Sequence, residues 1–189
     1  MKQIRSFIML CTTALLCNLS FGQGKMTAGD PVTVGGAPMY SSKNIIENAM
    51  NSKDHTTLVA AVKAAGLVET LEGPGPFTVF APTNEAFDML PKGTVDNLLK
   101  PENKATFTKI LTYHVVAGNW DTKALAEKIK AGNGTAELTA VSGGKLWASM
   151  NGNKIVLKDE MGKWTTIAIS NVYQSNRVIH VIDHVVMPR

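Results

Sequence analysis

The sequence predicts an α+β fold with a mainly antiparallel sheet system, and three patterns lead to this prediction. Segments with the apolar period of a helix dominate up to about residue 131. A short run of strand-forming residues at 77–80 interrupts them, and from Ala136 onward apolar residues recur at every second position. Helices, a buried strand, more helices and then a β-rich half are the order expected of an α+β domain.

The first 22 residues have the features of a secretory signal peptide. Lys2 and Arg5 precede an apolar run from Phe7 to Leu16, and small residues follow at positions 20 and 22. The apolar run is shorter than the roughly 20 residues that a membrane span needs. We therefore expect cleavage before Gln23, export from the cytoplasm, and no membrane insertion of the cleaved chain.

Length and composition are those of one ordinary globular domain. The chain has 189 residues, of which 44% are hydrophobic and 18% charged. Both cysteines, Cys11 and Cys17, lie in the expected signal peptide, so the exported chain would rely on packing rather than on disulfides. Loss of Lys2 and Arg5 would lower the formal charge from +4 to +2, and no Lys/Arg cluster is present. Nucleic acid is therefore not an expected partner.

Residues 23–42 are predicted to form a flexible N-terminal arm, ahead of a single domain at residues 43–189. Glycine and proline are frequent in this arm, and apolar periodicity is weak. These residues are Gly24, Gly29, Pro31, Gly35, Gly36 and Pro38. We expect the arm to be the least ordered part of the exported chain.

Two helices are predicted at the start of the domain. Apolar side chains fall on one helical face in residues 45–50, and residues 58–65 follow the i, i+3, i+4, i+7 spacing. Gly66 supplies the left-handed residue that often ends a helix, and Leu67 is placed for the hydrophobic contact beside it. His55 falls in a polar loop before the second helix, where we expect its side chain to contribute little to stability.

Residues 77–87 form a predicted junction between a strand and a helix. Residues 77–80 include aromatic and β-branched side chains that suit a buried, non-edge strand. Pro82 cannot donate a ladder hydrogen bond, so the strand should stop there. Thr83 is predicted to cap the next helix, with Glu85 in the first turn where the helix dipole favours a negative charge.

The middle of the chain is predicted to be mainly helical. Apolar stripes indicate helices over residues 94–99, from 107 to about 114, and over 122–130. Tyr113 to Val116 is rich in strand formers, so the second of these helices should give way to a strand before Gly118.

Short strands joined as hairpins are predicted after Ala136. Turn residues stand at 142–144, 151–153 and 161–163, and a last strand is expected over Arg177 to Val186. The expected inward-facing residues are Leu138 and Ala140, then Leu146, Ala148 and Met150, then Ile155 and Leu157, then Thr165, Ile167 and Ile169.

Three segments, in order, resemble the fasciclin domain, the FAS1 or beta-Ig-H3/fasciclin family of secreted and cell-surface modules. Residues 77–87 resemble its first block, 111–116 its tyrosine–histidine motif, and 178–188 its closing block. The resemblance runs from about Asn44 to Pro188 and is typical of a bacterial-type, secreted, single-domain member. The family-motif residues are Phe80, Pro82, Thr83, Asn84, Phe87, Tyr113, His114, His180 and Asp183.

The resemblance implies a compact wedge of two mainly antiparallel β-sheets with helices packed beside them. The chain departs from the family in two places. Arg177 stands where a glycine is frequent before the last strand, and residues 120–171 match by pattern alone. We expect any surface peculiar to this protein to be built in that second region.

His180, Asp183 and His184 resemble a metal site, because His-x-x-x-His can supply two ligands from one helix. The neighbouring residues are strand formers, and four residues of a strand span roughly 13 Å, too far for both imidazoles to share one ion. We therefore predict no metal site there.

Tyr113 and His114 could form an acid–base pair. We favour a structural role, in which alternating strand positions place one side chain in the core and the other towards a sheet edge. The exported chain has no cysteine, no Gly-x-Ser-x-Gly elbow and no glycine-rich phosphate loop. No catalytic residue and no cofactor is predicted, and we do not expect an enzyme.

The half of the chain that contains residues 120–171 is called the divergent half below. Four of its aromatic residues are either core residues or a ligand surface. They are Trp120, Trp147, Trp164 and Tyr173.

The resemblance suggests a secreted or periplasmic binding module, acting as a monomer in cell adhesion or surface association through a cell-surface or matrix protein or polysaccharide. The alternative is a carrier of a small apolar ligand such as a carotenoid or lipid, since some family relatives bind carotenoids. The aromatic content of the divergent half and the flexible Met39, Met150 and Met161 motivate it.

Overall fold

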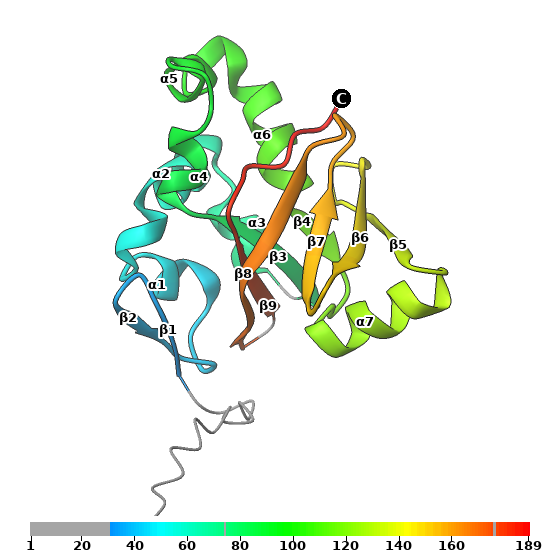
Figure 1. Cartoon of the computed structure of the whole chain (residues 1–189). Helices are drawn as coiled ribbons and strands as arrows, with labels where there is room; N and C mark the ends of the chain where they lie inside the picture. Colours follow the sequence, from blue (N-terminus) through cyan, green and yellow to red (C-terminus); the bar gives the residue numbers. More distant parts are fainter. Residues whose placement is uncertain (1–30, 74, 176) are drawn as a thin grey trace, which may run out of the picture.

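The computed structural model describes residues 31–73, 75–175 and 177–189 (Figure 1). The expected signal peptide and residues 23–30 of the expected arm lie outside these ranges. The described chain folds as helices and strands around one large, strongly curved sheet, as an α+β domain should.

The large sheet contains seven strands in the order β4-β3-β9-β8-β7-β6-β5. The pairing of β3 with β9 is parallel, and the other pairings are antiparallel. The helical segments that follow β3 separate it in sequence from its partners β4 and β9. The strands are β3 (Phe77–Pro82), β4 (Val115–Ala117), β5 (Thr135–Thr139), β6 (Lys145–Asn151), β7 (Lys154–Lys158), β8 (Trp164–Gln174) and β9 (Arg177–Ile182).

The long strand β8 divides this sheet into the two parts of a wedge. Its pairing with β9 shifts register between Ile167 and Ile169 and again before Val172, which marks bulges that bend the strand. Beyond the bend the sheet curls until its ends meet, because Val116 forms a β-bridge with Ala140. The edge of β5 is therefore partly covered by β4.

Helices cover the two parts of the sheet unequally. In Figure 1, α7 lies at the lower end of β5 and β6, and the other helices lie on the opposite side. The α-helices are α1 (Ile45–Ala49), α2 (Thr56–Ala65), α3 (Val68–Glu72), α4 (Asn84–Asp88), α5 (Thr94–Leu98), α6 (Lys104–Tyr113) and α7 (Thr122–Ala131), with 3-10 turns η1 (Lys53–His55) and η2 (Pro101–Asn103).

Strand β3 contributes to two hydrophobic cores. Val79 and Ala81 belong to the core beneath the helices α1 to α6. Phe80 points the other way, into the core enclosed by the curled sheet and α7. The expectation of apolar side chains on both faces of a central strand is confirmed.

The junction after β3 forms as predicted. The strand ends at Pro82, and the Thr83 hydroxyl accepts a hydrogen bond from the Ala86 amide at 3.3 Å, capping α4. The side chain of Asn84 reaches the start of α2, where it accepts from the Thr57 amide at 3.0 Å and donates to the Lys53 carbonyl at 2.8 Å. This motif residue therefore ties two helices together.

Most of the described part of the expected flexible arm is an ordered hairpin, so that prediction is wrong for residues 32–39. Strands β1 (Val32–Val34) and β2 (Ala37–Met39) pair antiparallel and pack beside α1 (Figure 1). Gly35 and Gly36 both have positive φ, as a tight two-residue hairpin turn requires. A side chain at Gly35 would collide with Ser52, since an added Cβ would lie 2.4 Å from its hydroxyl.

Four further expectations differ from the structure. Helix α3 was not predicted, and β9 ends at Ile182 rather than at Val186. Met150, expected to face inward, is 44% exposed. His55 is 2% exposed rather than part of a polar surface, with Nδ1 3.0 Å from the Ser52 hydroxyl.

Candidate functional site

Tyr113 lies at the C-terminal end of α6 and is fully buried, not on a strand as expected. Its hydroxyl donates to the Lys145 carbonyl at 2.5 Å and accepts from the Glu160 amide at 3.1 Å. Gly144 makes room for the ring, because a Cβ there would come within 2.6 Å of it. Burial raises the pKa of Tyr113, so its hydroxyl stays protonated and holds two loops together.

His114 caps the same helix and is also buried, which corrects the expectation that one of this pair lies towards a sheet edge. Its Nδ1 donates to the Ile110 carbonyl at 2.8 Å, and Nε2 accepts from the Val186 amide at 3.2 Å. Burial lowers its pKa to about 4, so the ring is neutral near pH 7. Both nitrogens are occupied by backbone groups, which favours a structural role over acid–base chemistry.

His180 in β9 is buried like His114, and both of its ring nitrogens also form hydrogen bonds with backbone groups. It pairs with Phe80 across the parallel ladder, and the two rings stack with centroids 5.7 Å apart. Its Nε2 donates to the Trp120 carbonyl at 2.7 Å, and Nδ1 accepts from the Asn171 amide at 3.4 Å. Burial lowers the pKa of His180. The closing block therefore places this histidine between the core and the segment that precedes α7.

Asp183 and His184 follow the end of β9 and are partly exposed. Asp183 accepts from the Thr166 amide, the Thr165 hydroxyl and His184 Nδ1, each at 2.8 Å. Partial burial acts to raise the pKa of Asp183, but these hydrogen bonds from His184, Thr166 and Thr165 lower it. In the described ranges, no group of three or more His, Cys, Asp or Glu side chains is arranged to hold a metal ion.

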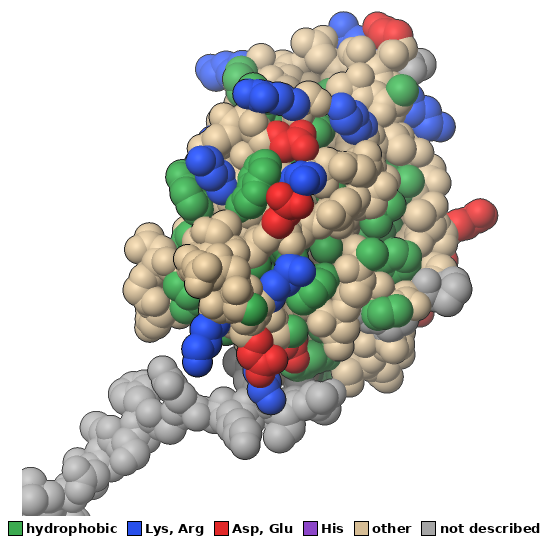
Figure 2. Space-filling view, turned by 90° about the vertical axis from the view of Figure 1, so that its right-hand side faces the viewer, with side chains coloured by type: hydrophobic (Ala, Val, Ile, Leu, Met, Phe, Trp, Pro, Cys, Tyr) green, Lys and Arg blue, Asp and Glu red, His purple; other side chains and the backbone are tan. Residues whose placement is uncertain are grey.

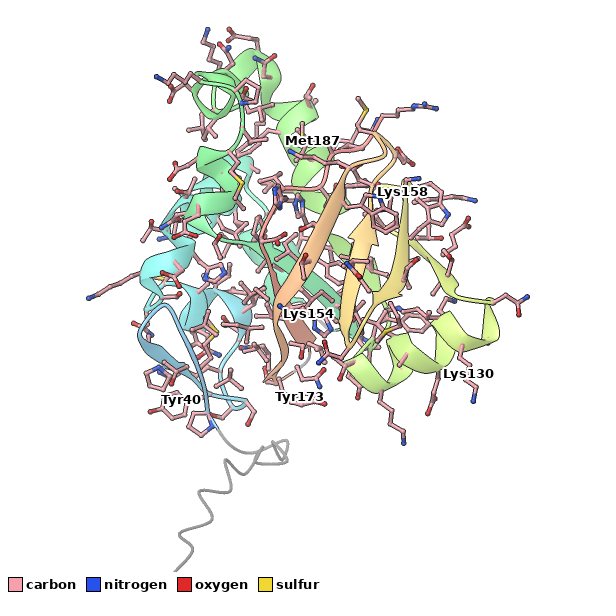
Figure 3. The ribbon with its side chains drawn as sticks, viewed as in Figure 1. Tyr40, Lys130, Lys154, Lys158, Tyr173 and Met187 are labelled. Atoms are coloured by element: carbon pink, nitrogen blue, oxygen red, sulfur yellow. The ribbon has the colours of Figure 1, made fainter. Side chains whose placement is uncertain are left out.

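The four aromatic residues of the divergent half do not form one surface. Trp120 packs against the core enclosed by the curled sheet and α7, and its indole N–H donates to the Ala117 carbonyl at 2.8 Å. The ammonium group of Lys128 lies 4.8 Å from the centre of its ring. Tyr173, near the lower end of β8 in Figure 3, has its hydroxyl 3.5 Å from an Asp121 carboxylate oxygen. These two residues therefore belong to the packing around the start of α7.

Trp147 and Trp164, in contrast, line one groove on the outer side of the curled sheet. The groove has a volume of about 500 Å³. Lys158, labelled in Figure 3 on the upper part of the sheet, lies between the two tryptophans in the strand register. The lining residues are Thr135, Trp147, Ser149, Lys158, Asp159, Glu160, Gly162 and Trp164. The sequence suggested the two tryptophans, but not Lys158, which the strand register alone brings between them.

A second hollow, which the sequence did not indicate, lies beneath the N-terminal helices. This cavity of about 60 Å³ is lined mainly by apolar side chains from α1, α2, α3, β3 and the end of α6. Thr112 and His114 are among the few polar residues on its wall. The helical spacing of apolar residues predicted α1, α2 and α6 around this cavity, but no residue pattern in the sequence indicates a gap between packed helices.

Comparisons with known proteins give consistent results. A family model described as the fasciclin domain matches residues 53–188. The protein sll1483 of Synechocystis is 45% identical over 162 residues, covering 86% of this chain and 83% of its own length. The cell surface glycolipoprotein MPB83 of Mycobacterium bovis is 31% identical over 175 residues, covering 88% of this chain and 70% of its own length. A FAS1 domain pair from the insect cell adhesion molecule fasciclin I aligns with a TM-score of 0.54 and 21% identity, covering 69% of this chain and 45% of that one.

The curled mixed sheet, its flanking helices and the buried tyrosine–histidine motif define an α+β module of the FAS1 class. The chain belongs to the fasciclin family. None of the helices in the described residues has the length and apolar character of a membrane span.

Proposed function

We propose that this protein is an exported, non-enzymatic binding module that mediates cell adhesion or association with a surface or matrix. The observation that carries the proposal is a contrast between the buried histidines of the family motifs and the exposed aromatic side chains of the outer groove. His114 and His180 have both ring nitrogens occupied by backbone groups. The outer groove, in contrast, offers side chains that a partner can reach, including Trp164, which is 50% exposed.

The family supports this proposal. One relative is described as a cell surface glycolipoprotein, and the aligned structure comes from a cell adhesion molecule. By analogy, this chain would act outside the cytoplasm, in the periplasm or beyond, as a monomer that contacts a cell-surface or matrix protein or a polysaccharide. The features of a signal peptide in residues 1–22 agree with this location.

An attachment assay tests the proposal directly. Cells with and without the protein are compared for attachment to a surface, and the purified protein is used to retain partners from surface extracts. We expect weaker attachment without the protein and at least one retained partner. Unchanged attachment together with an empty pull-down contradicts the proposal.

The apolar cavity supports a second candidate function, the carriage of a small apolar ligand. The sequence suggested a carrier because of the aromatic residues in the second half of the chain. The cavity lies instead beneath α1 to α3, so it is the cavity and not those aromatic residues that supports this function. A cavity of about 60 Å³ is far smaller than the roughly 300 Å³ at which ligand pockets begin, so a carotenoid or lipid would have to part the helices. Mass spectrometry and an absorption spectrum of protein purified from its native source test this candidate. A protein free of lipid and chromophore contradicts it.

A further inference from the structure

The outer face of the curled sheet carries a row of three side chains on neighbouring strands. Trp147 of β6 pairs with Lys158 of β7, which in turn pairs with Trp164 of β8. Their sequence neighbours Leu146, Leu157 and Thr165 are buried, so the row faces outward. Because adjacent strands lie about 4.8 Å apart, the two tryptophans are separated by roughly 10 Å along the row.

The two tryptophans of the row are available to a ligand in a way that Trp120 is not. Trp164 is 50% exposed, and Trp147 is partly exposed. In the described part of the chain, neither indole N–H has a hydrogen-bond acceptor, whereas that of Trp120 donates to a backbone carbonyl. The ammonium group of Lys158 lies over one face of the Trp164 ring, 5.6 Å from its centre, and this contact holds the lysine side chain beside that ring.

The rim of the groove is held in place by backbone hydrogen bonds to two carboxylates. Asp159 accepts from the amides of Lys163 at 2.8 Å and Met187 at 3.0 Å. Glu160 accepts from the amides of Lys145 and Arg189, both at 2.9 Å. A groove fixed in this way loses little conformational entropy when it binds.

The chemistry of this surface narrows the choice of partner. Lys145 is paired with Glu137 at 2.8 Å, and Lys158 lines the groove together with the carboxylates of Asp159 and Glu160. The groove therefore carries charges of both signs rather than the single sign that would attract a polyion. Basic, acidic and hydrophobic side chains are likewise mixed on the face shown in Figure 2.

A partner strand is also disfavoured, because the bridge from Val116 to Ala140 covers part of the edge of β5. What remains are the ring of Trp147, the face of Trp164 that Lys158 does not cover, the ammonium group of Lys158, and the hydroxyls of Thr135 and Ser149, which lie 3.4 Å apart.

We propose that this groove binds an extended, hydroxyl-rich polysaccharide, with sugar rings stacked on Trp147 and Trp164. The apolar C–H face of a pyranose ring suits an indole face, and its hydroxyl groups suit Lys158, Thr135 and Ser149. The spacing between the indoles is close to the length of a disaccharide unit in an extended chain. This assignment rests on the proposed function as a binding module and names its ligand class.

Affinity electrophoresis through gels that contain hydroxyethyl cellulose, xylan, laminarin or alginate tests the assignment. We expect at least one neutral polysaccharide to retard the unmodified protein. Trp147→Ala and Trp164→Ala should each weaken that retardation about tenfold in affinity, as loss of an aromatic anchor commonly does. Trp120→Ala is the matched control and should bind normally, since its side chain lies outside the groove. Trp164→Tyr should retain part of the affinity, because a smaller aromatic face remains.

Each outcome separates this assignment from the wider proposal. No retardation by any of the neutral polysaccharides, or normal retardation of both Trp147→Ala and Trp164→Ala, overturns it. If Trp147→Ala does not fold, the half-exposed Trp164 decides the result. The same variants are run in the attachment assay. If the protein supports attachment but binds no polysaccharide, the groove assignment is wrong and the adhesion function stands. If it binds polysaccharide through the tryptophans but does not support attachment, the adhesion function is wrong and the groove assignment stands.

Discussion

At the scale of single residues, His114 shows how a motif can serve packing. Its two ring nitrogens satisfy the Ile110 carbonyl and the Val186 amide, which would otherwise be buried without partners. His114→Ala should therefore destabilise the domain by roughly 1–3 kcal/mol for each group left unpaired. Urea denaturation followed by circular dichroism measures this loss.

His184→Ala is the control, because His184 forms a partly exposed pair with Asp183. It should cost less than about 1 kcal/mol. His55, which the sequence suggested as a control, is unsuitable because it is buried. A fully stable His114→Ala variant that has lost binding would contradict the structural role.

The buried histidines also predict how stability depends on pH. Burial lowers the pKa of His114 from 6.5 to about 4, and it lowers the pKa values of His55 and His180 as well. The unfolded chain therefore takes up protons first as the pH falls below 6.5, and the stability that depends on neutral His114 is lost between pH 6.5 and about 4. The titration of His114 accounts for about 2 kcal/mol of the stability that is lost between pH 7 and pH 5.

Denaturation midpoints of the unmodified protein and of His114→Gln at pH 7 and pH 5 check this share. The variant should lose about 2 kcal/mol less over the interval, because glutamine does not titrate. Equal losses in the two proteins contradict the assignment of this pH dependence to His114.

Sequence alone could place some of these residues and not others. Thr83 and Gly66 were identified correctly because capping depends on neighbours along the chain. His55 was missed because its neighbours Lys53 and Asp54 are polar, and its burial comes from tertiary packing. Local chemistry can be read from sequence, but burial of a polar side chain cannot.

At the scale of elements, the hairpin of β1 and β2 is part of the core rather than a tail. Val34 is 1% exposed and belongs to the core beneath the helices. Val34→Ala should therefore destabilise the domain by about 1–3 kcal/mol. Thr33→Ala, one position away and exposed, should change stability by less than about 0.5 kcal/mol.

Thermal or urea unfolding of the two variants compares them directly. If Val34→Ala is as stable as Thr33→Ala, the hairpin does not contribute to the folded core. The sequence suggested a flexible arm because glycine and proline are frequent there. It also contains Val32 and Val34 before Gly35 and Gly36, which is the pattern of a tight hairpin.

At the scale of the whole molecule, the two hydrophobic cores share strand β3. Val79 and Phe80 are adjacent in sequence but belong to different cores. Neither core can open without disturbing the strand on which both depend. We therefore expect one cooperative unfolding transition, with the calorimetric and van't Hoff enthalpies equal. Two resolved transitions in differential scanning calorimetry would show that the cores unfold separately.

The candidate site could be predicted only in part for a related reason. Trp147 and Trp164 were named from sequence together with Trp120 and Tyr173, since all four are aromatic residues of one region. Only the register of β6, β7 and β8 brings the first two together with Lys158. Register depends on pairing between strands distant in sequence, so composition cannot separate a groove residue from a packed one.

The parallel pairing of β3 with β9 also sets the order of events when the chain is made. Val79 pairs with Ile179, a hundred positions later. During synthesis, β3 cannot pair with β9 until the closing block of the sequence has been made. Pairing over such a separation makes folding slow, and it makes the last strand the step that commits the chain to its native topology. A nascent chain that stops before residue 177 therefore exposes β3 to other strands, which is the state most open to aggregation.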